Sequence, residues 1–350
     1  MDLIEIKGKV NTAICYVKVV EDEAIEQVRR MCNYIMTEGT KIRIMPDVHA
    51  GKGCTIGTTM TIADKVVPNV VGVDIGCGMY TVNLGKIDID FEKVDEAADG
   101  TKYLIVHSGS RNLGKQVAEL YQKLAINLNR GYGDYLEKRD GIIKTYKEQG
   151  RKNEIEETLK QLHWQVYESP TSVPEDLCYL KGKYLADYLH DVEICQSFAR
   201  RSREKMAEII LERTGMNGSG AFHTIHNYID TEEMILRKGA IVAHSGEKVL
   251  IPINMRDGSV LAIGKGNSEW NYSAPHGAGR IMSRSKAFRE LTMEEYKKIM
   301  EGVYTTSVNE HTLDEAPMAY KSLEDIIDVI KESVDVIDVM KPIYNFKASD

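Results

Sequence analysis

Residues 55–84, TIGTTMTIADKVVPNVVGVDIGCGMYTVNL, contain short apolar runs separated by Pro68-Asn69 and by several glycines. β-Branched and aromatic residues favour strands, whereas proline and glycine interrupt them. The stretch therefore predicts two or three strands. The preceding KIRIMPDVHAGKG (41–53) predicts a strand that runs into a glycine-rich loop, and KYLIVHSGSRN (102–112) predicts a strand that ends in a polar turn.

The pattern changes after Asn112, where charged and apolar residues recur at helical spacing over 113–150, 152–167 and 181–213. A proline-containing break, ESPTSVPEDL (168–177), separates the last two stretches. Strand-like sequence returns after residue 230, with further helices expected near 292–302 and 322–334 and a strand over 334–345. We therefore expect an α+β fold. Residues 1–350 would form a single catalytic domain with a mixed β-sheet core and a mostly helical insertion at about 113–215.

Composition excludes several classes of protein. Forty-five Lys and Arg against 53 Asp and Glu give a net charge of −8, which excludes a uniformly basic nucleic-acid binder but allows a local basic site. No apolar run approaches the roughly 20 residues of a membrane helix, and the N-terminus lacks a signal-peptide pattern. We therefore expect no membrane association and a cytoplasmic location. The six scattered cysteines contain no CxxC pair and are expected to be reduced thiols.

Two glycine-rich strings follow expected strands. Asp74-Ile75-Gly76-Cys77-Gly78 offers a carboxylate and a thiol that could turn toward one divalent ion such as Mn, Zn or Fe, or it is a tight turn with a buried cysteine. The string 107–112, HSGSRN, offers a histidine ligand beside backbone N–H groups and the guanidinium of Arg111, which together suit phosphate. The alternative is that His107 caps a turn.

Two further strings contain histidines. His223 and His226 are three residues apart, so on a helix both imidazoles would share one face. We favour His226 with the adjacent Asn227 as the functional pair, the alternative being a buried, hydrogen-bonded histidine.

The string 276–280, HGAGR, places His276 among small residues, and Arg280 and Arg284 would lie on one helix face. Such a histidine could attack phosphorus while the arginines neutralise phosphate oxygens; the alternative is a simple anion-binding turn. The loop that contains Asp47 and His49 is either a second polar loop feeding the same site or a surface turn. Together these strings have the composition of a metal-assisted phosphoryl-transfer site.

The chain resembles the RtcB family of RNA-splicing ligases. The strings that carry the resemblance, in the family's order, are MPDVHAGKG, VGVDIGCGM, HSGSRNLG, HNY, RKGA, PHGAGRIMSR, EAPMAYK and KPIYNFKA, over about residues 45–347. The resemblance implies an enzyme that joins RNA with a 3′-phosphate or 2′,3′-cyclic phosphate to RNA with a 5′-hydroxyl. It implies GTP and Mn(II) as cofactors and a histidine–GMP intermediate.

The resemblance also implies roles for individual residues. His276 would be the guanylylated nucleophile. Cys77, His107 and His226 would bind one Mn, and Asp74 with the shared Cys77 a second. The implied nucleotide-binding residues are Asn227, His276, Gly277, Ala278, Gly279, Arg280, Tyr320 and Lys347. To RNA or nucleotide phosphates we assign Arg111, Arg280 and Arg284, together with Asp47 and His49 of the second polar loop.

One family string is absent. A Gly-x-Gly-Asn-His-Phe-x-Glu string usually lies between the two motifs that contain Cys77 and His107, but only 29 residues separate these two positions here. In the family, its histidine completes the second metal site and its Phe and Glu help to select guanine. Two alternatives therefore stay open: a related enzyme that opens cyclic phosphates or caps 3′-phosphate ends without sealing, and a non-catalytic RNA-end binder. An activator protein is a further candidate partner.

Overall fold

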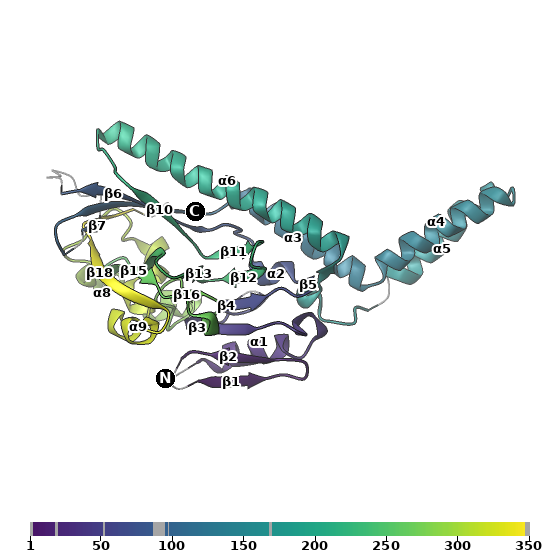
Figure 1. Ribbon diagram of the computed structural model, residues 1–350, viewed down its shortest axis with the longest axis horizontal. Helices are drawn as coiled ribbons and strands as arrows, with labels where there is room; N and C mark the ends of the chain where they lie inside the picture. Colours follow the sequence, from purple (N-terminus) through teal and green to yellow (C-terminus); the bar gives the residue numbers. More distant parts are fainter. Residues whose placement is uncertain are drawn as a thin grey trace.

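The structure is a computed structural model that describes residues 3–17, 20–51, 53–86, 95–96, 98–167 and 170–346. It has the expected α+β architecture, in which mixed β-sheets form the core and a group of helices follows the strand that ends near His107 (Figure 1). Within these ranges, no helix is both long enough and apolar enough to cross a membrane.

The first sheet contains, among the described residues, six strands. In spatial order they are β1 (Ile4–Lys7), β2 (Thr12–Cys15), β3 (Ile42–His49), β4 (Ile56–Thr61), β12 (Ile235–Lys238) and β11 (Asn227–Asp230). Neighbours are antiparallel except for the parallel pair β2 and β3. An apolar core that includes Ile44, Val70 and Tyr188 joins this sheet to the surrounding helices.

The second sheet contains seven strands in the part of the chain described. Their spatial order is β10 (Ala221–Ile225), β6 (Gly78–Gly85), β8 (Lys102–Ser108), β7 (Asp95–Glu96), β18 (Val334–Pro342), β15 (Gly258–Gly264) and β14 (Lys248–Asn254). Three short pairs accompany the two sheets: β5 (Lys65–Val66) with β9 (Leu180–Lys181), β13 (Ala240–Val242) with β16 (Ser273–Pro275), and β17 (Tyr304–Thr305) with β19 (Tyr344–Asn345).

The helices cover the sheets and extend beyond them. They are α1 (Asp22–Met31), α2 (Pro68–Val71), α3 (Arg111–Asn129), α4 (Tyr132–Glu148), α5 (Ile155–Tyr167), α6 (Lys183–Thr214), α7 (Arg284–Glu290), α8 (Met293–Ile299) and α9 (Leu323–Ile330). Helix α6 runs along the outside of the sheets and contacts β6, β8 and β11, whereas the α4–α5 hairpin projects away from the body (Figure 1).

Proline 46 shapes the strand that leads into the site. Proline has no backbone N–H, so it is found in sheets at edges and bulges. The β3–β4 register is regular up to Ile44, shifts, and resumes at His49. Asp47 lies in this irregular segment and is completely buried.

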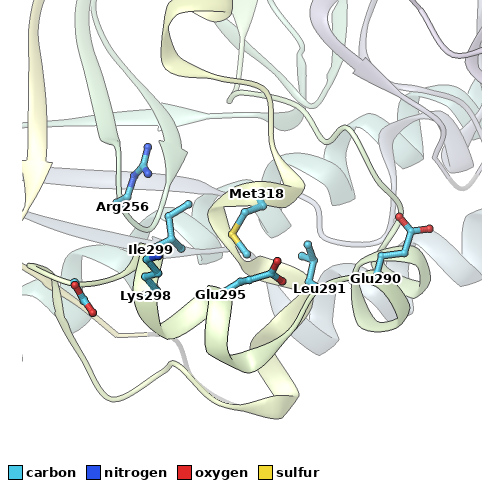
Figure 2. A pocket seen from close by; sticks show the side chains of 8 residues that line it. Arg256, Glu290, Leu291, Glu295, Lys298, Ile299 and Met318 are labelled. Carbon is cyan, nitrogen blue, oxygen red and sulfur yellow. The ribbon is translucent and has the colours of Figure 1, made fainter.

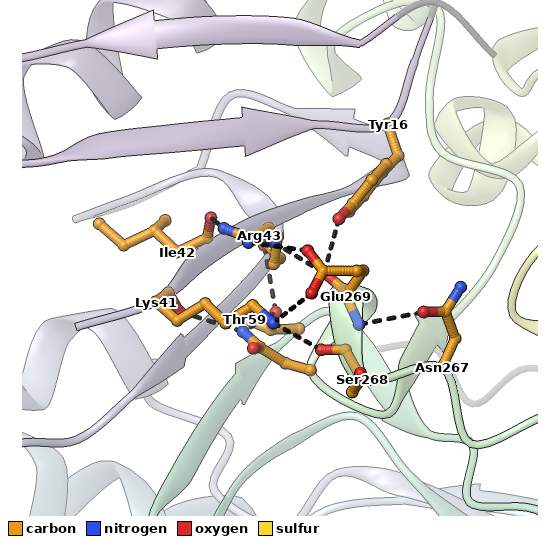
Figure 3. A network of polar contacts seen from close by, with 9 residues as sticks. Tyr16, Lys41, Ile42, Arg43, Thr59, Asn267, Ser268 and Glu269 are labelled. Carbon is orange, nitrogen blue, oxygen red and sulfur yellow. Dashed lines mark hydrogen bonds and ion pairs between the residues drawn. The ribbon is translucent and has the colours of Figure 1, made fainter.

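The other end of β3 is fastened by a polar network around Glu269 (Figure 3). The Tyr16 hydroxyl donates to the Glu269 carbonyl at 2.5 Å, and the Arg43 Nε–H donates to the same oxygen at 2.7 Å. The Tyr16 ring stacks on Trp270 with centroids 4.3 Å apart. These contacts join the first sheet to the turn η4 (Ser268–Trp270), which precedes the strand leading to His276.

Two local expectations are wrong: that the string 74–78 ends a strand, and that His223 and His226 lie on one helix. Pro68-Asn69 begins the short helix α2, because proline suits the first helical position and Val70 and Val71 are buried against the core. The string that contains Asp74 and Cys77 therefore precedes β6 instead of ending a strand. Residues 221–225 form strand β10, so His223 and His226 do not share a helix face.

Candidate metal and nucleophile site

Cys77, His107 and His226 meet at one point. The Cys77 Sγ lies 3.4 Å from His107 Nε2, which lies 3.4 Å from His226 Nε2. All three potential ligand atoms are within 4.8 Å of one another, and this is the one group of three or more such residues found among those described. Residues from three distant segments thus form a compact set of S and N donors.

Backbone pairing between the strands brings these donors together. Met79 pairs with His107 across β6 and β8, which places the Cys77 turn beside the end of β8. The His226 N–H donates to the Cys77 carbonyl at 2.9 Å, and the Gly76 N–H donates to the Asn227 carbonyl at 2.6 Å. Main-chain hydrogen bonds between the turn before β6 and the segment that joins β10 to β11 therefore hold the cluster together.

The chemistry of the cluster suits a divalent cation. Burial and then the charges of His276 and His107 hold the pKa of His226 well below its usual range, so its imidazole is neutral, as metal binding requires. Its Nδ1 is buried and has no hydrogen-bond partner among the described residues. Burial, followed by the nearby Asp74 carboxylate, raises the pKa of the Cys77 thiol, and a cation would favour the thiolate.

Asp74 lies beside this group but is not one of its three members. Its Oδ1 accepts a hydrogen bond from the Arg111 N–H at 3.3 Å. Arg111 adopts a positive φ of 53°, which is uncommon for a residue other than glycine. A Cβ on Gly109 would lie 2.1 Å from the same carboxylate oxygen, so only glycine fits there.

His276 lies next to the cluster and is oriented by Asp47. The His276 Nδ1–H donates to Asp47 Oδ2 at 2.6 Å, and the His276 backbone N–H donates to the same oxygen at 3.1 Å. The His276 ring centroid is 4.9 Å from that of His226. In a neutral ring whose proton is on Nδ1, Nε2 keeps its lone pair and could act as a nucleophile.

The segment after His276 approaches Asp47 closely. Gly279 has a φ of 74°, and a Cβ there would lie 2.5 Å from the Asp47 carbonyl oxygen. Ala278 is buried in the core of the second sheet, and Gly277 lies against the Pro252 carbonyl. These small residues let the segment 276–279 pack directly on β3.

His49 and Asn227 extend the polar surroundings of His276. The His49 Nδ1–H donates to the Asp47 carbonyl at 2.9 Å. Burial lowers the pKa of His49, with a smaller contribution from His276 in the same direction, so this imidazole is neutral near pH 7. The Asn227 Oδ1 accepts a hydrogen bond from the Gly239 N–H at 2.9 Å, which fixes the orientation of the amide.

Arg280 and Arg284 both contact Asp314 and Glu315, although the two arginines do not lie on one helix. Helix α7 begins at Arg284, whereas Arg280 forms an isolated bridge with Tyr320, so the expected common helix face is wrong. Arg280 donates to the Tyr320 hydroxyl at 3.0 Å, and Arg284 lies 3.2 Å from Glu315. Tyr320 in turn donates to Glu315 at 2.5 Å.

One residue of the sequence analysis lies away from the site, and another cannot be placed. His223 stacks on Tyr80 and lies 3.2 Å from Glu204, outside the donor group. Lys347 lies outside the described residues.

Sequence reasoning missed Arg203. It lies on α6 and donates to the Gly76 and Ser108 carbonyls, immediately beside the Cys77 and His107 positions. A signal was present, because Arg203 is four residues after Ala199 and four before Ala207, and so continues the buried face of the helix.

A separate surface pocket beside α8 shares no residue with this site (Figure 2). Its charged lining consists of Glu290, Glu295, Glu301, Arg256 and Lys298. Since carboxylates outnumber the cationic groups, the pocket is poorly suited to a nucleotide phosphate.

Comparisons with known proteins give matches that cover most of the chain. A family model described as tRNA-splicing ligase RtcB matches residues 27–102 and 87–348. The chain is similar to the RNA-splicing ligase RtcB of Escherichia coli, at 28% identity over 86% of this chain and 88% of that protein. It is also similar to the tRNA-splicing ligase RtcB of Aeropyrum pernix, at 28% identity over 66% of this chain and 48% of that protein. A third relative, the RNA-splicing ligase RtcB of Mycobacterium tuberculosis, is 24% identical over 80% of this chain and 67% of its own length.

Proposed function

Because the chain belongs to the RtcB family of tRNA-splicing ligases, we propose that it is a GTP- and Mn(II)-dependent RNA ligase. It joins RNA with a 3′-phosphate or 2′,3′-cyclic phosphate to RNA with a 5′-hydroxyl, through a histidine–GMP intermediate on His276. In this proposal residues 1–350 act as one catalytic domain, with the helices between residues 111 and 214 as an insertion. RNA is the partner, in tRNA splicing or in repair.

The observation that carries the proposal is the position of His276. The His276 Nδ1–H donates to Asp47 Oδ2 at 2.6 Å, and the His276 ring centroid lies 4.9 Å from that of His226 in the donor cluster. A nucleophile with a free Nε2 beside a cation site is what attack on a phosphate ester requires. This placement also gives Asp47 an orienting role in place of the phosphate contact that its loop suggested.

Cys77, His107 and His226 would hold the metal ion, with Asp74 beside them. The donor set alone also suits Zn or Fe, so Mn(II) is proposed on family membership. A bound cation would stabilise the negative charge that develops on the phosphate oxygens. Asp74 and Cys77 offer two donors toward a second ion, and the described residues supply no third donor that completes such a group.

In the first step, the His276 Nε2 lone pair forms a bond to the α-phosphorus of GTP. The bond between that phosphorus and the bridging oxygen breaks, and pyrophosphate leaves with the electron pair. The proton stays on Nδ1 of His276, and the Asp47 carboxylate that accepts its hydrogen bond stabilises the positive charge that develops on the imidazole. GMP then passes to the RNA 3′-phosphate, and the 5′-hydroxyl displaces it.

The residues around His276 would position the nucleotide and the RNA. We assign nucleotide contacts to Asn227, Tyr320 and the segment 277–280, and phosphate contacts to His49, Arg111 and Arg284. Because the His49 Nδ1–H is donated to the Asp47 carbonyl, the other ring nitrogen of the neutral imidazole can only accept a hydrogen bond. His49 therefore suits contact with a phosphate group that carries a proton better than contact with a phosphate dianion.

A second candidate is a related enzyme that transfers the nucleotide to RNA 3′-phosphate ends, or opens cyclic phosphates, without sealing. The absent Gly-x-Gly-Asn-His-Phe-x-Glu string favours it, because the second metal site and guanine selection would both be altered.

Mass spectrometry of the chain after incubation with MnCl₂ and each nucleoside triphosphate tests the proposal. We expect a GMP adduct on His276 from GTP and no adduct on the His276→Ala variant. RNA fragments with 3′-phosphate and 5′-hydroxyl ends then separate the two candidates, because only the ligase gives a joined product. Absence of an adduct with every nucleotide from the metal-loaded protein contradicts both nucleotide-transfer mechanisms.

A further inference from the structure

Arg203 is a charged residue in a position where helix α6 is otherwise apolar. Its exposed fraction is 0%, whereas the side chain of Arg201, two residues earlier, is 69% exposed. Arginine keeps its charge in proteins, and a buried charge is destabilising unless other groups compensate it. The surroundings of Arg203 must therefore supply hydrogen-bond acceptors and negative charge.

The acceptors come from the two segments that carry candidate metal ligands. Arg203 Nη1 donates to the Gly76 carbonyl at 2.7 Å and to the Ser108 carbonyl at 2.6 Å. Gly76 immediately precedes Cys77, and Ser108 immediately follows His107. The Arg203 Nη1 thus bridges the two segments and fixes the separation of Gly76 and Ser108, the neighbours of Cys77 and His107.

Helix α6 is held against the site by further contacts. A Cβ on Gly76 would lie 2.9 Å from the Gln196 Cα and 3.1 Å from the Ala199 Cβ, so the helix and the Cys77 turn are in close contact. The Gln196 Oε1 accepts a hydrogen bond from the Ile229 N–H at 2.9 Å, which extends the connection to the strand after His226. The guanidinium is therefore presented from a firmly seated helix.

The two carbonyls satisfy only part of the guanidinium. Among the described residues, its Nε and Nη2 are buried without a hydrogen-bond partner. The carboxylates whose charges act on it are Asp74 of the site and then Glu204 of the same helix. A bound cation that converts Cys77 to the thiolate would add a second negative charge of the site.

We propose that Arg203 is a positioning residue of the metal site: it holds the Cys77 and His107 segments at the separation that a bound cation needs. This inference rests on the metal site of the proposed function. It gives the helical insertion a role in assembling that site, because Arg203 is supplied by α6. Outer groups of this kind tune metal affinity by orienting the ligands without contacting the ion.

Cobalt titration of the full-length, chelator-stripped protein tests the inference. Co(II) reports its coordination by ligand-field absorption, and a bound thiolate adds a charge-transfer band. The variants are Arg203→Met, which removes the charge and both hydrogen bonds, and Arg203→Lys, which keeps the charge on a shorter donor. Arg201→Met, on the same helix but exposed, is the matched control, and thermal melts establish that each variant is folded.

We expect Co(II) to bind about 10- to 100-fold more weakly to Arg203→Met, with a shifted or diminished thiolate band, and Arg203→Lys to be intermediate. Arg201→Met should match the unmodified protein. A folded Arg203→Met with unchanged affinity and band overturns the inference. Should Arg203→Met fail to fold, unchanged Co(II) affinity of Arg203→Lys overturns it instead. Neither GTP nor RNA enters this titration, so a missing His276 adduct contradicts the proposed function while leaving this result intact.

Discussion

Replacement of Asp47 should slow formation of the His276–GMP adduct without emptying the metal site. Asp47 is completely buried, and its Oδ2 accepts hydrogen bonds from both the Nδ1–H and the backbone N–H of His276. A hydrogen bond to a charged group contributes about 1.5–3 kcal/mol. If the Nδ1 bond stabilises the transition state by that amount, Asp47→Ala slows adduct formation by about 10- to 150-fold.

The Asp47→Asn variant separates orientation from charge. Its side chain has nearly the same shape, and its amide oxygen can take the place of Oδ2 and accept from both N–H groups of His276, but it carries no negative charge to stabilise the imidazolium. We therefore expect Asp47→Asn to react more slowly than the unmodified protein and faster than Asp47→Ala. A role in packing alone predicts no slowing in Asp47→Asn.

The assay is the rate at which intact protein gains the mass of GMP after GTP is added to the metal-loaded enzyme. Exposed Asp64, which pairs with Lys65, supplies the control variant Asp64→Asn. Metal content should be unchanged in every variant, since Asp47 is not part of the donor group. Adduct formation by Asp47→Ala at the rate of the unmodified protein would refute the orienting role, and the same result for Asp47→Asn would refute the contribution of the Asp47 charge.

Three further predictions follow from the site and its surroundings. Cys77→Ala should abolish stoichiometric metal binding, measured by elemental analysis after dialysis, because two imidazoles alone make a poor site; full retention of metal would contradict the cluster. The Arg284 side chain is 70% exposed. Arg284→Ala should weaken RNA binding and reduce the slope of log K against log [salt] by about 0.7. An unchanged slope would exclude a phosphate contact. Burial lowers the pKa of His223 from its ordinary value of 6.5 although Glu204 opposes the shift, so the unfolded chain takes up this proton first as the pH falls. As the pH is lowered below about 6.5, the melting temperature of the metal-free protein should therefore decrease, and it should decrease less in His223→Gln. His190→Gln, a control at an exposed histidine, should behave like the unmodified chain. Equal decreases in all three proteins would count against His223 as the origin.

The sequence was most informative where one local signal decided the structure. The helical spacing after Asn112 predicted the helices that begin at Arg111, and the alternation in 334–345 predicted β18. Helix α2 was missed because a proline between valines also marks a strand break, and burial against the core decided between the two. His223 and His226 at i and i+3 suit a helix, but pairing of β10 with β6 places them in and just after a strand.

For the site, the sequence predicted which residues matter better than how they are arranged. Cys77, His107 and His226 were identified from their strings, and the structure brings these three together. The contact between Asp47 and His276 spans more than two hundred residues, so no local pattern contains it. Arg203 was overlooked because an arginine in a charged helix is ordinarily exposed, and only the packing of α6 on Gly76 shows otherwise.

Two of the close approaches of glycine in the site link positions that are distant along the chain. Gly109 lies against the Asp74 carboxylate, and Gly279 lies against the Asp47 backbone. A methyl group gained at either glycine would displace an acidic residue of another segment. In evolutionary terms, we therefore expect each glycine and the aspartate that it contacts to vary together.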